Sequence, residues 1–135
     1  MRRWHWLFVC CFTIGCGSAE PFDYVPISGR IMYEDGTQIP SNGMRLMFVA
    51  QDVPQTQNLS PRPALANVNA EGEFDCVTSH KYGDGLIPGR HKVVIQADPV
   101  REGRPIFPRA CLSVTSTPLV IDTADAPLSI KVPKP

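Results

Sequence analysis

The sequence has no excess charge of either sign, because 13 basic and 13 acidic residues balance over 135 positions. A balanced chain gives no electrostatic reason to expect a nucleic-acid partner. After the N-terminal region, no segment carries apolar residues at helical spacing, so a helical bundle is excluded as well. The 14 prolines and 10 glycines favour a chain with many turns. The length allows one domain with a single core.

The residue arrangements that usually carry catalysis are missing too. Gly83, Gly85 and Gly89 precede an expected strand, whereas a phosphate-binding loop precedes a helix. No serine has the flanking pattern of a nucleophile elbow. His80 and His91 flank the glycine-rich stretch, but with the nearby aspartates they match no known metal-ligand spacing. We therefore expect no enzyme activity, no catalytic or metal-binding residue and no cofactor. We expect His91 half-buried at a core edge and His80 on the surface.

The N-terminal residues read as an export signal. Arg2 and Arg3 precede an apolar run, residues 4–14, that is too short to cross a bilayer comfortably. The run ends in Thr13-Ile14-Gly15-Cys16. This resembles the bacterial lipobox, in which a peptidase cleaves before a cysteine whose thiol carries diacylglycerol. Thr13 departs from the pattern, since a Leu is usual there.

Two cleavage sites are compatible with this signal. Cleavage before Cys16 makes residues 1–15 a lipoprotein signal peptide, lipidates Cys16 and leaves residues 16–24 as a short tether. Ordinary secretory cleavage after Ala19 is the alternative. In the first case the membrane is a partner through the lipid alone, because the mature chain has no basic excess. Gly17 after the cysteine resembles the sorting pattern for the outer membrane of diderm bacteria. We therefore expect a cell-envelope location, at the outer membrane or the periplasmic face.

The rest of the chain predicts short strands, organised around residues 69–97. Within this stretch Asn69-Ala70-Glu71-Gly72 has the composition of a tight turn, and a glycine-rich loop separates two strands. Leu86 and Ile87 are too apolar for a solvated loop, so we expect them to close one end of the core. The strands expected along the chain are residues 27–33, 44–51, 64–68, 73–78, 90–97, 112–114, 119–122 and 128–132.

Short strands with one apolar face each predict an all-β fold. We expect an antiparallel β-sandwich of seven to eight strands over residues 25–133, in which two sheets bury their apolar faces against each other. Four motifs appear in order: Ile27-Ser28-Gly29-Arg30-Ile31, Asn69-Ala70-Glu71-Gly72-Glu73-Phe74, Gly83-Asp84-Gly85-Leu86-Ile87-Pro88-Gly89 and Lys92-Val93-Val94-Ile95. Their order resembles the carboxypeptidase regulatory-like or transthyretin-like (Greek key) β-sandwich of small bacterial secreted lipoproteins. The resemblance implies a non-catalytic accessory or structural module without a shared active site.

Two cysteines remain in the mature domain if Cys16 is lipidated. Cys76 stands at an apolar core position of the expected strand, and Cys111 lies near the start of the last strands. An oxidising compartment favours a disulfide between them, which would close a loop of about 35 residues and contribute about 3 to 4 kcal/mol. Two buried free thiols are the alternative, because cysteine packs well as a small hydrophobe.

Two loops are candidates for a binding surface. Residues 51–63 form the longest irregular segment, and residues 98–108 bring Arg101, Glu102 and Arg104 close to Arg109. A solvated connection and a solvated edge are the simpler interpretations.

Together these features predict a lipid-anchored, non-catalytic module of the cell envelope. It would present loops, or an exposed edge strand, to an envelope protein or polysaccharide in a structural or protein-interaction role. The alternative is a module that binds a small ligand or carbohydrate. That role usually needs an aromatic platform, and Trp4 and Trp6 both leave with the signal peptide.

Overall fold

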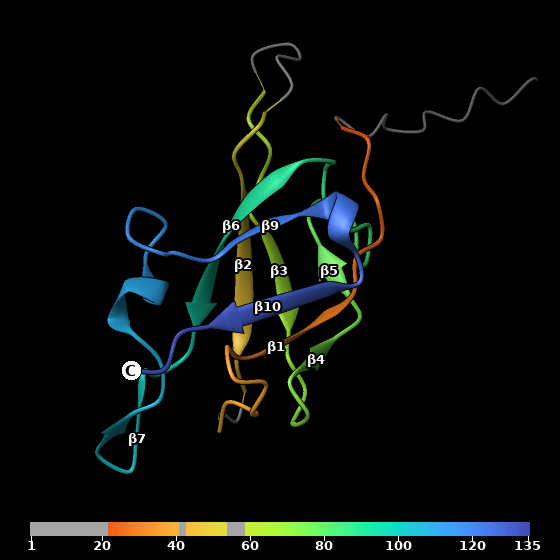
Figure 1. Cartoon of the computed structure of the whole chain (residues 1–135). Helices are drawn as coiled ribbons and strands as arrows, with labels where there is room; N and C mark the ends of the chain where they lie inside the picture. Colours follow the sequence, from red (N-terminus) through yellow and green to blue (C-terminus); the bar gives the residue numbers. More distant parts are fainter. Residues whose placement is uncertain (1–21, 41–42, 54–58) are drawn as a thin grey trace, which may run out of the picture.

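Figure 1 shows the computed structural model, which describes residues 22–40, 43–53 and 59–135. Ten strands and two short 3-10 helices occur in these residues, and none of their helices is long and apolar enough to cross a membrane. The strands form two layers and one small hairpin, so the predicted all-β sandwich is confirmed. The expected signal peptide and lipidated Cys16 lie outside the described residues, as does the middle of the long loop at residues 54–58.

The larger sheet has five strands, and all of its pairs are antiparallel. In spatial order they are β5 (Val77–Thr78), β3 (Ala64–Asn67), β2 (Arg45–Ala50), β6 (Arg90–Gln96) and β9 (Val120–Asp122). In β6, His91, Val93 and Ile95 are each at most 2% exposed, as predicted, but Val94 on the opposite face is buried as well. The register places Phe48 of β2 between Val93 and Ala64, so three buried side chains lie side by side.

The smaller sheet has three strands, β10 (Leu128–Val132), β1 (Gly29–Tyr33) and β4 (Glu73–Phe74), in that order. β1 and β10 are parallel, which corrects the expectation of a purely antiparallel sandwich. A hairpin turn forces antiparallel pairing, but these strands stand at opposite ends of the domain and no tight turn joins them. In Figure 1 the two strands cross in front of β2 and β3 at a steep angle.

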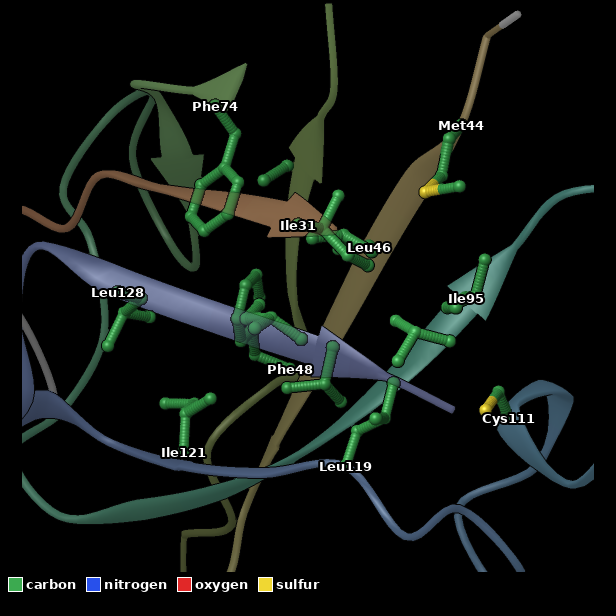
Figure 2. Close-up of a cluster of buried hydrophobic side chains, with 14 of the residues drawn as sticks. Ile31, Met44, Leu46, Phe48, Phe74, Ile95, Cys111, Leu119, Ile121 and Leu128 are labelled. Atoms are coloured by element: carbon green, nitrogen blue, oxygen red, sulfur yellow. The ribbon is translucent and has the colours of Figure 1, made fainter. Parts of the chain in front are cut away.

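The core lies between the two sheets. Figure 2 shows the ring of Phe74, from the smaller sheet, pointing toward Phe48 of the larger one. The rings of Phe48 and Phe74 lie 5.9 Å apart between centroids and are tilted by 52°, a favourable aromatic geometry. Each apolar face is buried because the alternation of every strand turns the same set of side chains inward.

The glycine-rich loop closes one end of the core, as predicted. Leu86 and Ile87 are only 1% and 3% exposed. Leu86 exchanges two backbone hydrogen bonds with Val25, of 2.8 and 3.0 Å, which bind the loop to the chain before β1. Gly85 allows this approach: its φ is +97°, and a Cβ there would lie 1.8 Å from the Val25 carbonyl oxygen. Phe22, in the predicted tether, is also buried.

The segment before the last strands differs from the expectation. The strand expected at residues 112–114 is wrong: a 3-10 helix, η1 (Arg109–Leu112), is followed by turns. The Ser113 carbonyl accepts from Thr117 N–H at 2.9 Å, and the Ser113 and Thr115 hydroxyls bond to each other at 2.9 Å. Hydroxyl side chains offer local partners of this kind, and these compete with a strand ladder. The loop expected at residues 98–108 contains a hairpin of β7 (Val100–Arg101) and β8 (Arg104–Pro105).

Candidate functional site

The carboxylate of the glycine-rich loop is used by the loop itself. Asp84 accepts hydrogen bonds from the backbone N–H groups of Ser79 (2.8 Å), His80 (3.0 Å) and Lys81 (2.8 Å). Burial raises the pKa of Asp84, but these three bonds outweigh burial and the pKa is lowered overall. The Ser79 hydroxyl donates to the Gly85 carbonyl at 2.6 Å. The polar groups of this loop therefore hold its own conformation.

The two histidines of the domain lie in contrasting places. His80 is exposed, as predicted, whereas His91 is 2% exposed and so more deeply buried than predicted. His91 stands between Ala50 of β2 and Ile121 of β9, inside the sheet rather than at its border. Burial lowers the pKa of His91, although its Nδ1 lies 3.2 Å from the Gly89 carbonyl oxygen, which favours the protonated form. His91 is therefore a neutral core residue.

No metal site is formed by the parts of the chain that the structure describes. Among residues 22–40, 43–53 and 59–135, no three His, Cys, Asp or Glu side chains are placed to hold an ion.

Both domain cysteines are free thiols in the structure, so it does not contain the bridge considered from the sequence. The single strand expected at residues 73–78 is instead two short strands of different sheets, β4 and β5, and Cys76 lies half-buried between them rather than at a core position. Cys111 is fully buried in η1, which packs on β6. β5 and β6 are three strand positions apart, about 14 Å at the usual spacing, whereas a disulfide needs Cα atoms within about 7 Å. Figure 2 shows the Cys111 sulfur in the core, at the end away from Phe74. Burial raises the pKa of the Cys111 thiol.

The basic residues of the second loop lie on the β7–β8 hairpin. Arg101, Glu102 and Arg104 are exposed, and Glu102 occupies the turn with a φ of +52°. The Arg101 guanidinium donates to the Pro40 carbonyl at 2.7 Å. Arg109 is exposed at the start of η1. Arg101 thus bonds the hairpin to the rest of the domain. All three arginines are exposed to solvent, as the interpretation of a solvated edge expects.

A polar hollow of about 410 Å³ lies at the start of the smaller sheet, beside β4. Its walls include Arg30 and Glu73, which form an ion pair that lowers the pKa of the Glu73 carboxyl, and Asp75. Asn69 also lines the hollow, and its side-chain oxygen accepts from the backbone N–H groups of Glu71 (3.0 Å) and Glu73 (2.8 Å). We call this the β4 hollow. Many of its polar atoms already have partners within the protein.

The outer side of β10 leaves backbone groups without partners. Leu128 N–H donates to the chain just before β1 (2.9 Å), and the Val132 carbonyl accepts from the residue just after β1 (3.0 Å). In a ladder, residues that bond to one neighbour alternate with residues that face the opposite side. The N–H and C=O groups of Ser129 and Lys131 therefore point away from β1, where no described strand pairs with β10. We call these four groups the β10 edge.

A second, smaller hollow of about 250 Å³ lies beside the β10 edge, between β9 and β10. It is lined by Val120, Ile121 and Asp122 of β9, by Leu128 and Ser129 of β10, and by Arg90 and Asp125. Val120 is 54% exposed, the highest value for any large aliphatic side chain among the described residues. We call this the β9–β10 hollow. It places a mixed apolar and charged surface next to unpaired backbone groups.

The charged residues that line the β9–β10 hollow are Arg90, Asp122 and Asp125. Arg90 makes two hydrogen bonds to the Asp52 carboxylate, of 3.0 and 3.1 Å, and Asp122 accepts from Ala124 N–H at 2.9 Å. Asp125 in the hollow and Lys131 beside it are exposed, and neither takes part in the ion pairs found among the described residues. The Lys131 Nζ lies 3.6 Å from the sulfur of Met32.

The sequence pattern predicted β10 as a strand but did not indicate that one of its sides is open. The signal lay in the prolines on either side, Pro127 and Pro133, because proline near a strand is typical of a sheet edge. Comparison with known proteins adds no relative to this picture: no family model, no curated protein and no solved structure matches the chain.

Proposed function

We propose that the protein is a lipid-anchored, non-catalytic module of the cell envelope whose role is to bind another envelope protein. The observation that carries the binding role is the β10 edge, where Ser129 and Lys131 present unpaired backbone groups beside a partly apolar hollow. Open edges recruit other chains, so proteins usually shorten, bulge or cover them, or place lysine and proline on them. Lys131 and the flanking Pro127 and Pro133 limit indiscriminate pairing at β10, but no described strand covers the edge, so it can receive a strand of matching charge.

The proposal of a non-catalytic role is supported by how the reactive side chains are used. Asp84 is held by three backbone amides, His91 is buried and neutral, and Cys111 is buried in the core. The Asp84 carboxylate thus holds its own loop, and the other two side chains are enclosed in the core. We retain the likeness to transthyretin-like sandwiches of bacterial lipoproteins as part of the proposal, since an all-β sandwich is the fold that the likeness implies.

Crosslinking in intact cells tests the proposed function. The full-length chain carries a photoreactive residue, placed in turn at Lys131 and at exposed Arg104, and the crosslinked proteins are identified by mass spectrometry. We expect one envelope protein to be recovered with the lipidated chain, and we expect that protein, tagged in turn, to recover this one. The Cys16→Ser variant, which lacks the lipid acceptor, is the control and should lose both the membrane fraction and the partner. Recovery of no protein above this control would contradict the proposal.

The β4 hollow supports a second candidate, the binding of a small polar ligand or carbohydrate. Its volume of about 410 Å³ and its amide, carboxylate and guanidinium groups are suited to hydroxyl-rich ligands. However, its aromatic residue, Phe74, is only 2% exposed and offers no stacking surface. A glycan array distinguishes the two candidates, with Asn67→Ala as the variant because Asn67 also lines the hollow. Binding above background that this variant removes would favour the ligand, and an empty array would exclude the glycans tested.

A further inference from the structure

The β10 edge has features that select the kind of chain it would bind. We infer that it accepts an extended segment of a partner protein as an added antiparallel strand, and that this segment alternates apolar and acidic residues. The inference rests on the proposed function and names the chemistry of the partner.

The backbone of β10 supports strand addition. Ser129 and Lys131 offer two N–H donors and two C=O acceptors on the open side, and an antiparallel strand would exchange a pair of hydrogen bonds with each. β10 has five residues, whereas the other strands at sheet edges have three (β9) or two (β4, β5, β7 and β8). It is thus the longest edge in the described part of the chain. Antiparallel addition is favoured because it is the more stable of the two pairings.

The apolar half of the pattern follows from the β9–β10 hollow. Successive side chains of an added strand point to opposite faces. Those on the inner face would continue the inner face of β10 into the β9–β10 hollow, where the inward-facing Ile121 and Leu128 are among the lining residues. Apolar side chains there would pack against these two residues and remove apolar surface from water. Apolar residues are therefore expected at every second position of the bound segment.

The acidic half of the pattern follows from Lys131. On the outer face, side chains of the added strand would lie next to Ser129 and Lys131, which are both exposed. Opposite charges on neighbouring strands stabilise a sheet, and Lys131 has no carboxylate partner among the described residues. The adjacent Arg30 is already paired with Glu73. Lys131 is therefore the residue that would select an acidic side chain.

Peptide selection on the full-length protein tests this inference. The chain is purified in detergent micelles and panned against a phage-displayed library of random linear peptides. We expect the enriched peptides to alternate apolar and acidic residues. Adding one such synthetic peptide should slow hydrogen exchange at the amides of Ser129 and Lys131, which point to solvent in the free protein.

Two variants identify the edge as the binding site. Ser129→Pro removes one outward N–H and places a ring on the edge without removing a bond to β1, so we expect about a tenfold or greater loss of affinity. Ser129→Thr keeps the N–H and is the matched control, expected to bind like the wild type. Lys131→Glu leaves the backbone intact, so it remains informative if the proline variant does not fold. Lys131→Glu should lower the affinity for the acidic peptides by about tenfold and shift the selection toward basic peptides.

Several outcomes would overturn the inference. These are a library that yields no binder, peptides that bind Ser129→Pro and Lys131→Glu as tightly as the wild type, and exchange protection confined to other strands. Self-association in the absence of peptide that Ser129→Pro abolishes would assign the edge to a second copy instead. A cellular partner whose crosslinking is unaffected by Ser129→Pro would leave the proposed function standing and remove only the edge as its site.

Discussion

The glycine-rich loop and the β10 edge treat their polar groups in opposite ways. In the loop, the Asp84 carboxylate accepts hydrogen bonds from three backbone N–H groups, and the Ser79 hydroxyl donates to a backbone carbonyl. At the β10 edge, Ser129 and Lys131 keep their backbone groups unpaired. The loop looks like a functional motif in the sequence, and the strand looks ordinary. Their hydrogen bonds reverse that impression, because only unpaired groups remain free to bind something else.

The largest expected effect comes from breaking the loop at Gly85. In Gly85→Ala the new Cβ would overlap the Val25 carbonyl oxygen, and the residue would also carry an unfavourable positive φ. We expect a loss of about 3 kcal/mol or more in the free energy of unfolding, measured by chemical denaturation. Gly36→Ala is the control: its φ is +84° but nothing lies within 4 Å, so only about 1 to 2 kcal/mol should be lost. Equal losses in both variants would show that the loop does not close tightly on Val25.

A smaller effect is expected when the loop loses its carboxylate. Asp84→Ala leaves three backbone N–H groups without their acceptor, so we expect a loss of about 2 kcal/mol. Asp75→Ala is the control, because Asp75 is exposed, and it should change stability by less than about 0.5 kcal/mol. A neutral result at position 84 would mean that water replaces the carboxylate.

The pH dependence of stability provides an independent measure of the same group. The folded state lowers the pKa of Asp84, so the ionised carboxylate stabilises the fold above its ordinary pKa of about 4. This contribution is lost as the pH falls from about 4 through the lower pKa of the folded state. As the pH is lowered across this range, the free energy of unfolding should therefore fall more steeply for the wild type than for Asp84→Ala. Parallel curves would contradict the assignment.

At the β10 edge, a proline should have little effect on stability. Ser129 N–H makes no bond to β1, so Ser129→Pro should lower the free energy of unfolding by less than about 1 kcal/mol. Met32→Pro is the control on the neighbouring strand: its N–H lies in the β1–β10 ladder, and at least about 2 kcal/mol should be lost. If the two variants are equally destabilised, Ser129 N–H is bonded in the folded protein and the edge is not open.

The smallest effect concerns the two domain thiols, Cys76 and Cys111. They should differ in how fast they react with a thiol reagent, without a change in the stability of the protein. Cys76 is half-buried, whereas Cys111 is fully buried with a raised pKa. Without reductant, we expect Cys76 to react with a maleimide first and Cys111 to react only as the protein opens. Mass spectrometry of the Cys76→Ser variant assigns the slow site. Absence of reaction at both residues after unfolding would indicate a disulfide.

Local patterns in the sequence predicted most of the strands correctly. The alternation around His91, Val93 and Ile95 identified the buried face of β6, and the apolar pair in the glycine-rich loop identified the closed end of the core. These predictions succeed because side-chain direction in a strand repeats every two residues and depends only on neighbours along the chain. The expectation at residues 112–114 failed because Ser113 and Thr115 form local hydrogen bonds that a hydrophobic pattern does not record.

The candidate site was harder to predict than the fold. Cysteines, a basic cluster and a glycine-rich loop stand out in the sequence. In the structure the cysteines pack in or near the core, the glycine-rich loop closes on itself and the basic cluster lies on a solvated edge. Whether a strand lies at an edge depends on which other strands reach it. Pro127 and Pro133 hinted at the edge, but prolines also end strands inside a sheet, so the hint was not specific.

The sequence by itself determined that this chain is an all-β protein and which face of each principal strand is buried. Only the tertiary structure decided that β1 pairs in parallel with β10 and that the far side of β10 stays open. The physical reason is the distance along the chain over which each property is set. The direction of a side chain in a strand depends on adjacent residues, whereas strand pairing joins residues from the two ends of the domain. An unpaired backbone group can be recognised only when all of its potential partners have been placed.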